Sequence, residues 1–387
     1  MVTTARLVLV CVLLTVALSA MNGETAELTK EKLQVFFLAG QSNMLGHAHI
    51  VTLPYMQKSA EEDVKKLTRL VFPNGKVSDE TVQRFFVATE PEERVAAIKE
   101  FGFAAAERVF IAKTGPERRG KLTVGYGGSP EKIGPEYGFG LSLEQKLKAP
   151  ILLIKTAWGG KSLHYDFRPP SAGPYELTAG EKLRNEAEAK KAADENKEFT
   201  PYTGDKAGFF YDEMIKYAHD VLNDLKTYHP DYDEKVGYEV AGFVWFQGFN
   251  DQFDPEFISN YASNMVALIG DIRKEFKTPE MPVVIGVLGT GMTAEKIAKN
   301  KISLAQRKTA AMPELENTVA AVECFPIYPL EIVPLFKVWQ KRFDEWKLVG
   351  SDRPYHYLGC GKFFVRLGDA FSDAMVDLMK KQHVGEK

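Results

Sequence analysis

Five apolar segments rich in β-branched and aromatic residues alternate with longer segments of helical character along this chain of 387 residues. Such alternation favours a parallel sheet with helices on both faces, because each crossover between parallel strands needs a long connection. Near-continuous apolar runs are typical of strands that are buried on both faces. We therefore predict a three-layer α/β/α sandwich with a mainly parallel sheet of about five strands, at 33–39, 150–157, 240–247, 281–288 and 318–324.

The predicted helices occupy 92–113, 140–148, 210–228, 255–277, 294–311 and 357–381. No repeat or low-complexity linker divides the chain, so we predict one domain over 30–384. Two regions stand outside the alternation: the glycine-rich region 115–140, read as a surface loop, and the region 171–206, with a charged helix at 181–191. Such insertions either shape a substrate site or form solvated decoration.

The first 20 residues have the pattern of a secretory signal peptide. Arg6 precedes an apolar run at 7–18, and the small residues Ser19 and Ala20 follow it. The run is short for a bilayer span and acidic residues follow, so we predict cleavage near Ala20 and no stable membrane insertion afterwards. The protein is then exported to the periplasm or the extracellular space, and an uncleaved anchor is the alternative.

Cysteine content and net charge limit the expected thiol chemistry and the kinds of ligand. Signal cleavage removes Cys11 and leaves Cys324 and Cys360, which in an exported protein either pair or remain two separate buried thiols. The formal charge is −3 and no basic stripe is present, which argues against a nucleic-acid partner. A neutral or mildly polar ligand suits this balance.

Ser42 lies on the turn that follows the first predicted strand. The strand at 33–39 ends in Gly40 and Gln41, and helix-compatible sequence begins after Ser42. A hydroxyl at the carboxyl end of a strand, beside the N–H groups of a helix start, is well placed to act as a nucleophile. The alternative is that Ser42 only caps the next helix.

A nucleophilic serine needs a base, a group that orients the base, and donors for the developing oxyanion. His356 lies in a polar loop before the last predicted helix, with Asp352 four residues upstream, and such a pair can supply an oriented neutral imidazole. Two segments that follow predicted strands offer donors: Gly159 and Gly160 through backbone N–H groups, and Asn250 through its side-chain amide. All of these residues follow strands or lie in the last loop, so we expect them at one edge of the sheet.

With these residues in place, the chain resembles the SGNH-type hydrolases. It is most similar to their branch of sialate O-acetylesterase-like and acetylxylan-esterase-like carbohydrate esterases. Gly-Gln-Ser-Asn-Met at 40–44 resembles the first block of that family, which makes Ser42 the nucleophile and one oxyanion donor. Gly-Pro-Glu-Tyr-Gly-Phe-Gly at 134–140 resembles the Gly-Pro-Glu segment of the family. The resemblance runs over roughly 33–379 and implies an SGNH, flavodoxin-like sandwich.

The other blocks of the family assign the remaining roles. Trp-Gly-Gly at 158–160 resembles the second block, where a glycine N–H donates to the oxyanion, and Gln-Gly-Phe-Asn-Asp at 247–251 is similar to the third, with Asn250 as a donor. Asp352 and His356 resemble the last block, with His356 as the base. Four residues of these blocks are also candidates for substrate binding, because aromatic rings can stack on pyranose rings and amides can bond to hydroxyl groups: Gln41, Gln247, Trp158 and Phe249.

The sequence departs from the pattern of the family at two places. Phe249 replaces a Glu that is common in the third block, and three residues instead of two separate Asp352 from His356. The carboxylate that orients His356 therefore stays open: Asp352, Asp251, Glu323, or a Ser–His dyad with a backbone carbonyl, can fill this role.

The resemblance implies a serine carbohydrate esterase that removes O-acetyl groups from a sugar or polysaccharide and needs no metal or organic cofactor. Ser42 attacks the ester and His356 moves the proton. One alternative is a catalytically impaired carbohydrate-binding protein with the same fold. Another is a hydrolase or acyltransferase that acts on a different small ester.

Overall fold

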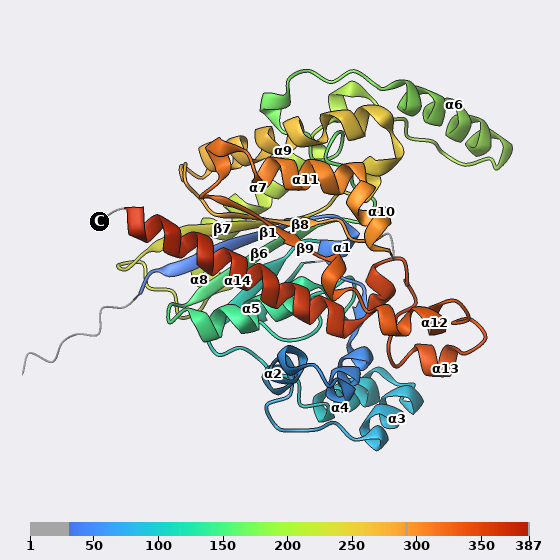
Figure 1. The fold of residues 1–387 in the computed structure, drawn as a ribbon, viewed down its shortest axis with the longest axis vertical. Helices are drawn as coiled ribbons and strands as arrows, with labels where there is room; N and C mark the ends of the chain where they lie inside the picture. Colours follow the sequence, from blue (N-terminus) through green and yellow to red (C-terminus); the bar gives the residue numbers. More distant parts are fainter. Residues whose placement is uncertain (1–30, 116, 291–292, 386–387) are drawn as a thin grey trace, which may run out of the picture. The chain divides into compact units, whose positions relative to one another are not determined.

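A seven-stranded sheet lies at the centre of the part of the chain that the computed structural model describes, residues 31–115, 117–290 and 293–385. The strand order is β4-β3-β6-β1-β7-β8-β9 (Figure 1). The strands are β1 (Leu33–Gly40), β3 (Val109–Lys113), β4 (Arg118–Lys121), β6 (Ile151–Ala157), β7 (Tyr238–Phe246), β8 (Val283–Val287) and β9 (Val319–Glu323). A separate antiparallel pair joins β2 (Ala48–His49) to β5 (Lys132–Ile133). The predicted signal peptide and Cys11 lie outside the described residues.

The main sheet is parallel except where β4 runs antiparallel to β3. The central strand β1 pairs with β6 on one side and β7 on the other, and the register places Gly40 beside Ala157 and Phe246. Three strands thus end together. The segments that follow them meet at one edge, which is where open α/β sheets bind ligands.

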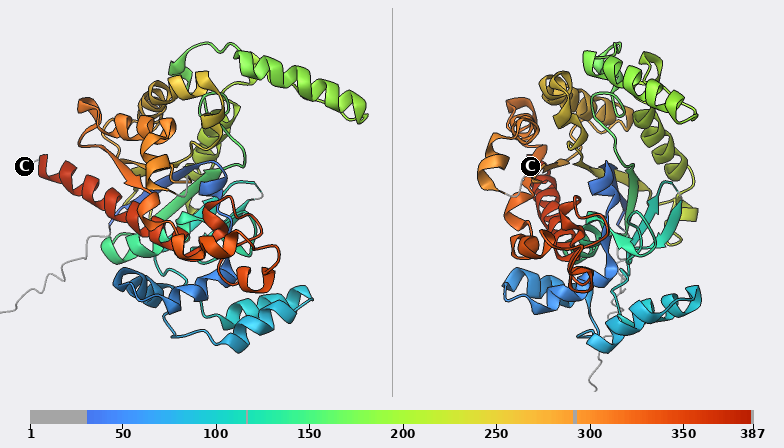
Figure 2. Two further views of the ribbon diagram at one scale, coloured as in Figure 1. Left: turned by 45° about the vertical axis from the view of Figure 1, so that its right-hand side comes forward. Right: turned by 90° about the vertical axis from the view of Figure 1, so that its right-hand side faces the viewer.

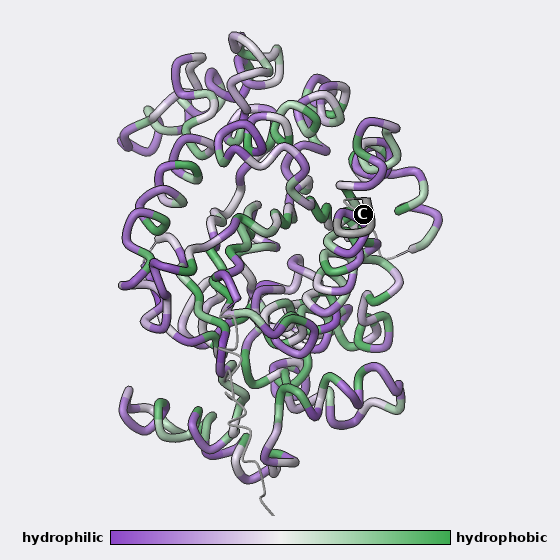
Figure 3. Tube along the Cα trace, turned by 90° about the vertical axis from the view of Figure 1, so that its left-hand side faces the viewer, coloured by the Kyte–Doolittle hydropathy of each residue, from purple (hydrophilic) through white to green (hydrophobic). Residues whose placement is uncertain are grey.

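Helices cover both faces of the sheet (Figure 1). On one face lie α5 (Pro135–Lys146) and α14 (Gly361–Gly385), and on the other lie α7 (Phe209–Leu222), α9 (Pro255–Glu275) and α11 (Lys301–Ala310). Side chains alternate along β1, so Phe36 and Leu38 join the core beneath α5 and α14, while Val35 and Phe37 join the core on the other face. Apolar segments gather in the interior between these layers (Figure 3).

The predicted α/β/α sandwich is confirmed, with seven strands in place of about five. Each of the five predicted strands is present, with ends within two residues of the prediction. The predicted helix over 92–113 is wrong in its second half, because α4 (Pro91–Glu100) ends before Gly102, which has φ +62°. The last residues of that stretch form β3 instead, since pairing with β6 buries all five of them.

The two predicted insertions differ in character. The charged helix is present as α6 (Ala179–Asp194), which starts with a capping box between Thr178 and Glu181 and projects away from the sheet (Figure 2). The region 115–140 is more than a loop, because it contains β4, β5 and the start of α5.

The described part also contains shorter α-helices and several 3-10 helices, the longest of which is Ile50–Lys58. The shorter α-helices are α1 (Ser42–Leu45), α2 (Glu62–Val71), α3 (Asp79–Val87), α8 (Leu225–Tyr228), α10 (Ala294–Lys299), α12 (Val333–Phe336) and α13 (Phe343–Trp346). The predicted helices over 210–228 and 294–311 are each divided in two, as α7 with α8 and α10 with α11. Cys324 and Cys360 are separate, buried free thiols. Among the described helices, none is long and apolar enough to cross a bilayer.

Candidate active site

Ser42 begins the one-turn helix α1 directly after β1. Gly40 has φ +151°, and a Cβ atom at this position would collide with the carbonyl oxygen of Phe246, so glycine lets β1 pass close to the end of β7. The N–H of Gln41 then donates to that carbonyl at 3.3 Å, and the N–H of Gly46 closes the turn on the carbonyl of Ser42 at 3.0 Å. The position of Ser42 is therefore fixed by backbone contacts on both sides.

The side chain of Gln41 ties this turn to the segment after β7. Its Oε1 accepts hydrogen bonds from the N–H groups of Gly248 (3.1 Å) and Asn250 (3.3 Å), and its Nε2 donates to Oδ1 of Asn250 (2.9 Å). Nδ2 of Asn250 in turn donates to the carbonyl of Gly160 at 2.9 Å. These contacts bring together residues from the first, second and third sequence blocks, next to Ser42.

The glycines after β6 lie open to solvent. Gly159 and Gly160 are exposed, and Gly160 has φ +71°, a conformation that glycine adopts without strain. Within the described residues, neither N–H group makes a hydrogen bond to the protein. These groups and the second N–H of the Asn250 amide are therefore available to an oxyanion.

A buried network holds this edge in place. The carboxylate of Asp251 accepts hydrogen bonds from the N–H groups of Leu163 (2.9 Å) and His164 (3.0 Å) and from Nε2 of Gln247 (2.6 Å). Burial raises the pKa of Asp251 to about 7, against the lowering effect of these donors. Nε2 of Gln247 also donates to the carbonyl of Lys161 at 2.9 Å, so the loops after β6 and β7 are tied together.

The four residues with implied substrate-binding roles divide into two kinds. Gln41 and Gln247 are 1% and 2% exposed and their amides bond to the protein, so in this structure they position the loops. Trp158 and Phe249 are half-buried, with Trp158 against Phe210 and Phe249 against the exposed Phe253. Direct contact of these side chains with a substrate stays a prediction.

His356 lies in the loop between α13 and α14. Its ring is 4.3 Å from the ring of His47, which follows α1 by two residues, so the loop is adjacent to the helix that carries Ser42. Tyr357 anchors the loop to the sheet: its ring packs on Phe246 at 5.6 Å, and its hydroxyl accepts a hydrogen bond from the N–H of Gly289 at 3.0 Å. The base predicted from the sequence thus lies at the same edge as the other site residues.

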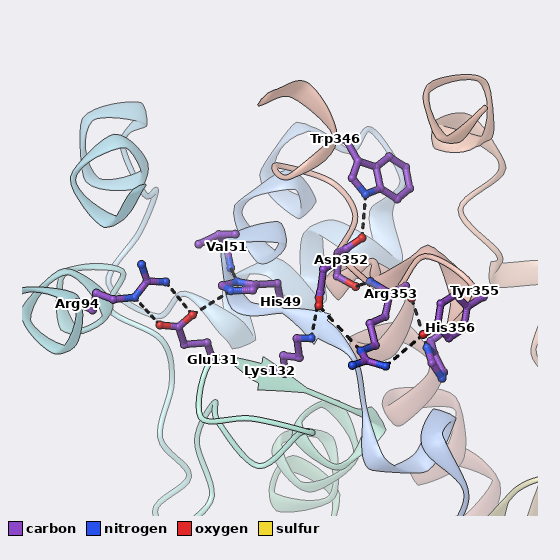
Figure 4. A network of polar contacts seen from close by, with 11 residues as sticks. His49, Val51, Arg94, Glu131, Lys132, Trp346, Asp352, Arg353, Tyr355 and His356 are labelled. Carbon is purple, nitrogen blue, oxygen red and sulfur yellow. Dashed lines mark hydrogen bonds and ion pairs between the residues drawn. The ribbon is translucent and has the colours of Figure 1, made fainter. Parts of the chain in front are cut away.

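Asp352 contacts a residue other than His356 (Figure 4). Its Oδ1 accepts a hydrogen bond from Nζ of Lys132 on β5 at 2.7 Å, and its side chain is 59% exposed. Nδ1 of His356 faces the carbonyl oxygen of Arg353 at 3.4 Å. In this structure, the backbone carbonyl therefore occupies the orienting position that the sequence assigned to Asp352.

The two other carboxylates considered for this role are engaged elsewhere. Asp251 binds the loop after β6, as described above, and Glu323 forms a two-pronged ion pair with Arg307 at 2.6 and 2.9 Å. Of the groups considered for this role, the carbonyl of Arg353 is the one that contacts Nδ1 of His356 in this structure.

Both histidines at this edge favour the neutral form. Burial lowers the pKa of His356 to about 4, although the hydrogen bond to the Arg353 carbonyl raises it. The nearby cations Arg353 and Lys132 lower this pKa further than Asp352 raises it. Burial and the neighbouring His356 lower the pKa of His47 to about 3. A neutral imidazole is the form that can accept a proton from a serine hydroxyl.

One buried ion pair was missed by the sequence reasoning. Nζ of Lys155 on β6 contacts Oε2 of Glu136 at 2.6 Å, both side chains are fully buried, and Nζ also donates to the carbonyl of Leu45 at 3.0 Å. Oε1 of Glu136 accepts from the N–H of Gly134 at 2.9 Å. The pair thus supports the end of α1, and a lysine inside an apolar strand was the signal that could have revealed it.

Comparison with models of protein families gives an extended match. The family model described as carbohydrate esterase, sialic acid-specific acetylesterase, matches residues 32–324. A search of curated proteins gave no match. Among solved structures, a protein from Arabidopsis thaliana is 16% identical with a TM-score of 0.45, over 89% of this chain and 98% of the other.

Two further solved structures are similar to the chain. A carbohydrate acetylesterase from Xanthomonas citri is 16% identical with a TM-score of 0.39, over 76% of this chain and 50% of the other. A protein named NanS is 11% identical with a TM-score of 0.41, over 76% of this chain and 78% of the other. Because the family model matches most of the chain, the protein belongs to the carbohydrate esterase family of sialic acid-specific acetylesterases and is a carboxylic ester hydrolase.

Proposed function

We propose that this protein removes O-acetyl groups from a sugar or polysaccharide through an acyl-enzyme. Oγ of Ser42 attacks the ester carbonyl while His356 takes the hydroxyl proton. The ester C–O bond breaks, and His356 returns the proton to the departing sugar oxygen. Water, activated by the same imidazole, then hydrolyses the acetyl-serine and releases acetate.

One observation carries this proposal: the chain of hydrogen bonds from Gln41 through Asn250 to Gly160, beside Ser42. An amide nitrogen has two N–H groups, and the bond to the carbonyl of Gly160 uses one of them. The other can meet an oxyanion together with the N–H of Ser42 and that of Gly159 or Gly160. Donors fixed before the reaction stabilise the charge without reorganisation, which is why such groups act strongly.

The contacts of His356 support its role as the base. With a proton on Nδ1 shared with the carbonyl of Arg353, the lone pair on Nε2 is free to accept a proton from Ser42. The lowered pKa keeps the ring neutral near pH 7. We therefore propose a Ser42–His356 dyad, oriented by a backbone carbonyl, with Asp352 in a secondary electrostatic role.

The substrate of this proposal is an acetylated carbohydrate, as the family description indicates. The half-buried rings of Trp158 and Phe249 at the same edge are suited to contact a sugar. The pattern of residues 1–20 supports export, which would bring the enzyme to extracytoplasmic glycans.

Covalent labelling together with product analysis tests the proposal. The wild-type protein should react with a fluorophosphonate at Ser42 and release acetate from acetylated glycans, whereas Ser42→Ala should do neither. Ser263→Ala, an exposed serine on α9, serves as the matched control and should behave as wild type. An unlabelled wild-type protein that binds glycans without releasing acetate would instead indicate a catalytically impaired binding protein.

A further inference from the structure

A cavity of about 420 Å³ lies beside the loop that carries His356. It is bounded by α3 and α4 on one side and by α13 and the following loop on the other, and its lining includes Asp352, four residues before His356. This volume falls within the range of about 300–1,000 Å³ that is usual for small-molecule sites. A larger hollow of about 650 Å³ is remote from the chemistry, because it surrounds Tyr238 at the amino end of β7.

The walls of this cavity come from parts of the chain outside the regular α/β alternation. Phe343, Lys347 and Asp352 lie beyond residue 324, where the match to the family model ends. The opposite wall comes from the pair α3 and α4, which precedes β3. The cavity therefore combines residues within the stretch matched by the family model with residues that lie beyond it.

The polar groups of the lining are held in fixed positions (Figure 4). Nε and Nη2 of Arg94 donate to the two carboxylate oxygens of Glu131 at 2.7 and 2.8 Å, and Nε2 of His49 contacts the same carboxylate at 3.1 Å. On the other side, Lys132 holds Asp352 at 2.7 Å. Fixed donors and acceptors of this kind bind hydroxyl groups at a low entropic cost, because they are already ordered.

An aromatic ring stands at the rim. Phe343 lines the cavity and is 48% exposed, so part of its ring is open to a ligand. Phe86 also lines it, but Nζ of Lys347 lies 4.3 Å from the centre of that ring. An open ring beside fixed hydrogen-bonding groups matches a sugar, which presents C–H faces and hydroxyl edges.

The charges of the lining are balanced. Its three cations are each paired with a carboxylate: Arg94 with Glu131 at 2.7 Å, Lys132 with Asp352 at 2.7 Å, and Lys347 with Asp344 at 2.7 Å. A carboxylated sugar would need an unpaired cation here, since its own desolvated charge would otherwise remain uncompensated. The lining therefore favours an uncharged sugar.

We propose that this cavity is a glycan subsite, which binds an uncharged sugar residue next to the one whose acetyl ester reaches Ser42. The inference rests on the proposed esterase function and adds a site for a second sugar residue to it. The Lys132–Asp352 ion pair joins the lining of the cavity to the loop that carries His356, and this adjacency is the ground for placing the subsite beside the reacting ester.

Kinetics on substrates of different size test the subsite. The measured quantity is the ratio of kcat/KM on acetylated xylo-oligosaccharides to kcat/KM on 4-nitrophenyl acetate, which has no sugar residue to place in the cavity. Phe343→Ala should lower this ratio about five- to tenfold, because a ring–sugar contact is lost. Phe343→Trp should retain it, and the control Tyr238→Ala, an exposed ring at the opposite edge of the sheet, should leave it unchanged. An unchanged ratio in Phe343→Ala would overturn the subsite.

Equilibrium binding separates this inference from the proposed function. Ser42→Ala protein is titrated calorimetrically with deacetylated xylo- and manno-oligosaccharides and with sialyllactose. Binding of an uncharged oligosaccharide, weakened about five- to tenfold by the added Phe343→Ala change, supports the subsite even if the wild type releases no acetate. Failure of every uncharged oligosaccharide to bind, or binding that Phe343→Ala leaves unchanged for all of these glycans, contradicts it while the esterase activity of Ser42 remains testable on 4-nitrophenyl acetate.

Discussion

Gln41 and Asn250 exchange two hydrogen bonds, although 209 residues separate them in the chain. The side-chain amide of Gln41 donates to Oδ1 of Asn250 at 2.9 Å, and the backbone N–H of Asn250 donates to Oε1 of Gln41 at 3.3 Å. The residue that precedes Ser42 thus sets the orientation of the Asn250 amide, which we propose as an oxyanion donor. This relationship explains why glutamine, with both a donor and an acceptor, stands at this position.

Replacement of Asn250 tests its role as a donor. Asn250→Ala should lower kcat by about 10²–10³, the usual loss when one oxyanion donor is removed. KM should change little, because the contact strengthens only as charge develops. Steady-state kinetics with 4-nitrophenyl acetate provide the measurement, and circular dichroism confirms that the variant is folded. A rise in KM equal to the fall in kcat would point to a structural role of Asn250 instead.

Gln41→Leu should reduce kcat through Asn250. The loss should approach that of Asn250→Ala, because the amide is no longer held toward the oxyanion. The double variant should then be little worse than either single variant, since both changes remove the same interaction. If the fold reduction of kcat in the double variant equalled the product of the two single reductions, Gln41 and Asn250 would act independently.

The pH dependence of kcat/KM reports the state of His356. A protonated imidazole cannot accept the proton of Ser42, so activity falls as the pH drops through the pKa of His356. Because that pKa is lowered to about 4, the acid limb should lie near pH 4, well below the value of about 6.5 for an unperturbed histidine. Lys132→Met removes a cation that lowers this pKa and should move the limb to higher pH. A limb near pH 6.5 in the wild type would contradict the lowered pKa, and a limb that Lys132→Met does not move would show that a group other than His356 titrates.

Asp352→Asn distinguishes the dyad from a full triad. Because Asp352 binds Lys132 and the Arg353 carbonyl meets Nδ1 of His356, the substitution should lower kcat only a few-fold. His356→Ala should nearly abolish turnover. A loss near about 10⁴ for Asp352→Asn, as when the orienting carboxylate of a triad is replaced, would mean that Asp352 leaves Lys132 and reaches His356 during the reaction.

Much of this arrangement can be predicted from local sequence. The run into Ser42 combines an apolar strand with a glycine turn, and both features are visible without the fold, as is the alternation that predicts the parallel sheet. Strand β3 was missed because its five residues adjoin a long helical pattern, and pairing with β6 decides their conformation.

The partner of Asp352 could not be predicted in the same way. Lys132 is 220 residues away in sequence, on a two-residue strand, and a short spacing from Asp352 to His356 is a stronger local signal than this distant contact. Which residue of opposite charge Asp352 meets depends on the three-dimensional path of the chain. The spacing of a motif suggests a partner for Asp352, but only the fold shows the contact with Lys132.

The buried Lys155–Glu136 pair should dominate the stability of this edge. Lys155→Met leaves the carboxylate of Glu136 buried without its cation, which usually costs about 3–5 kcal/mol of unfolding free energy. It also removes the donor to the carbonyl of Leu45, so the turn that carries Ser42 should loosen and kcat should fall together with the midpoint of denaturant unfolding.

Adding Glu136→Gln to Lys155→Met removes the unpaired charge and should recover part of the stability but little of kcat, since the bond to α1 is still missing. Urea denaturation and kinetics on both variants check this, with the exposed pair variant Lys299→Met as the control. Full recovery of kcat in the double variant would show that the pair contributes stability alone and does not position the helix of Ser42.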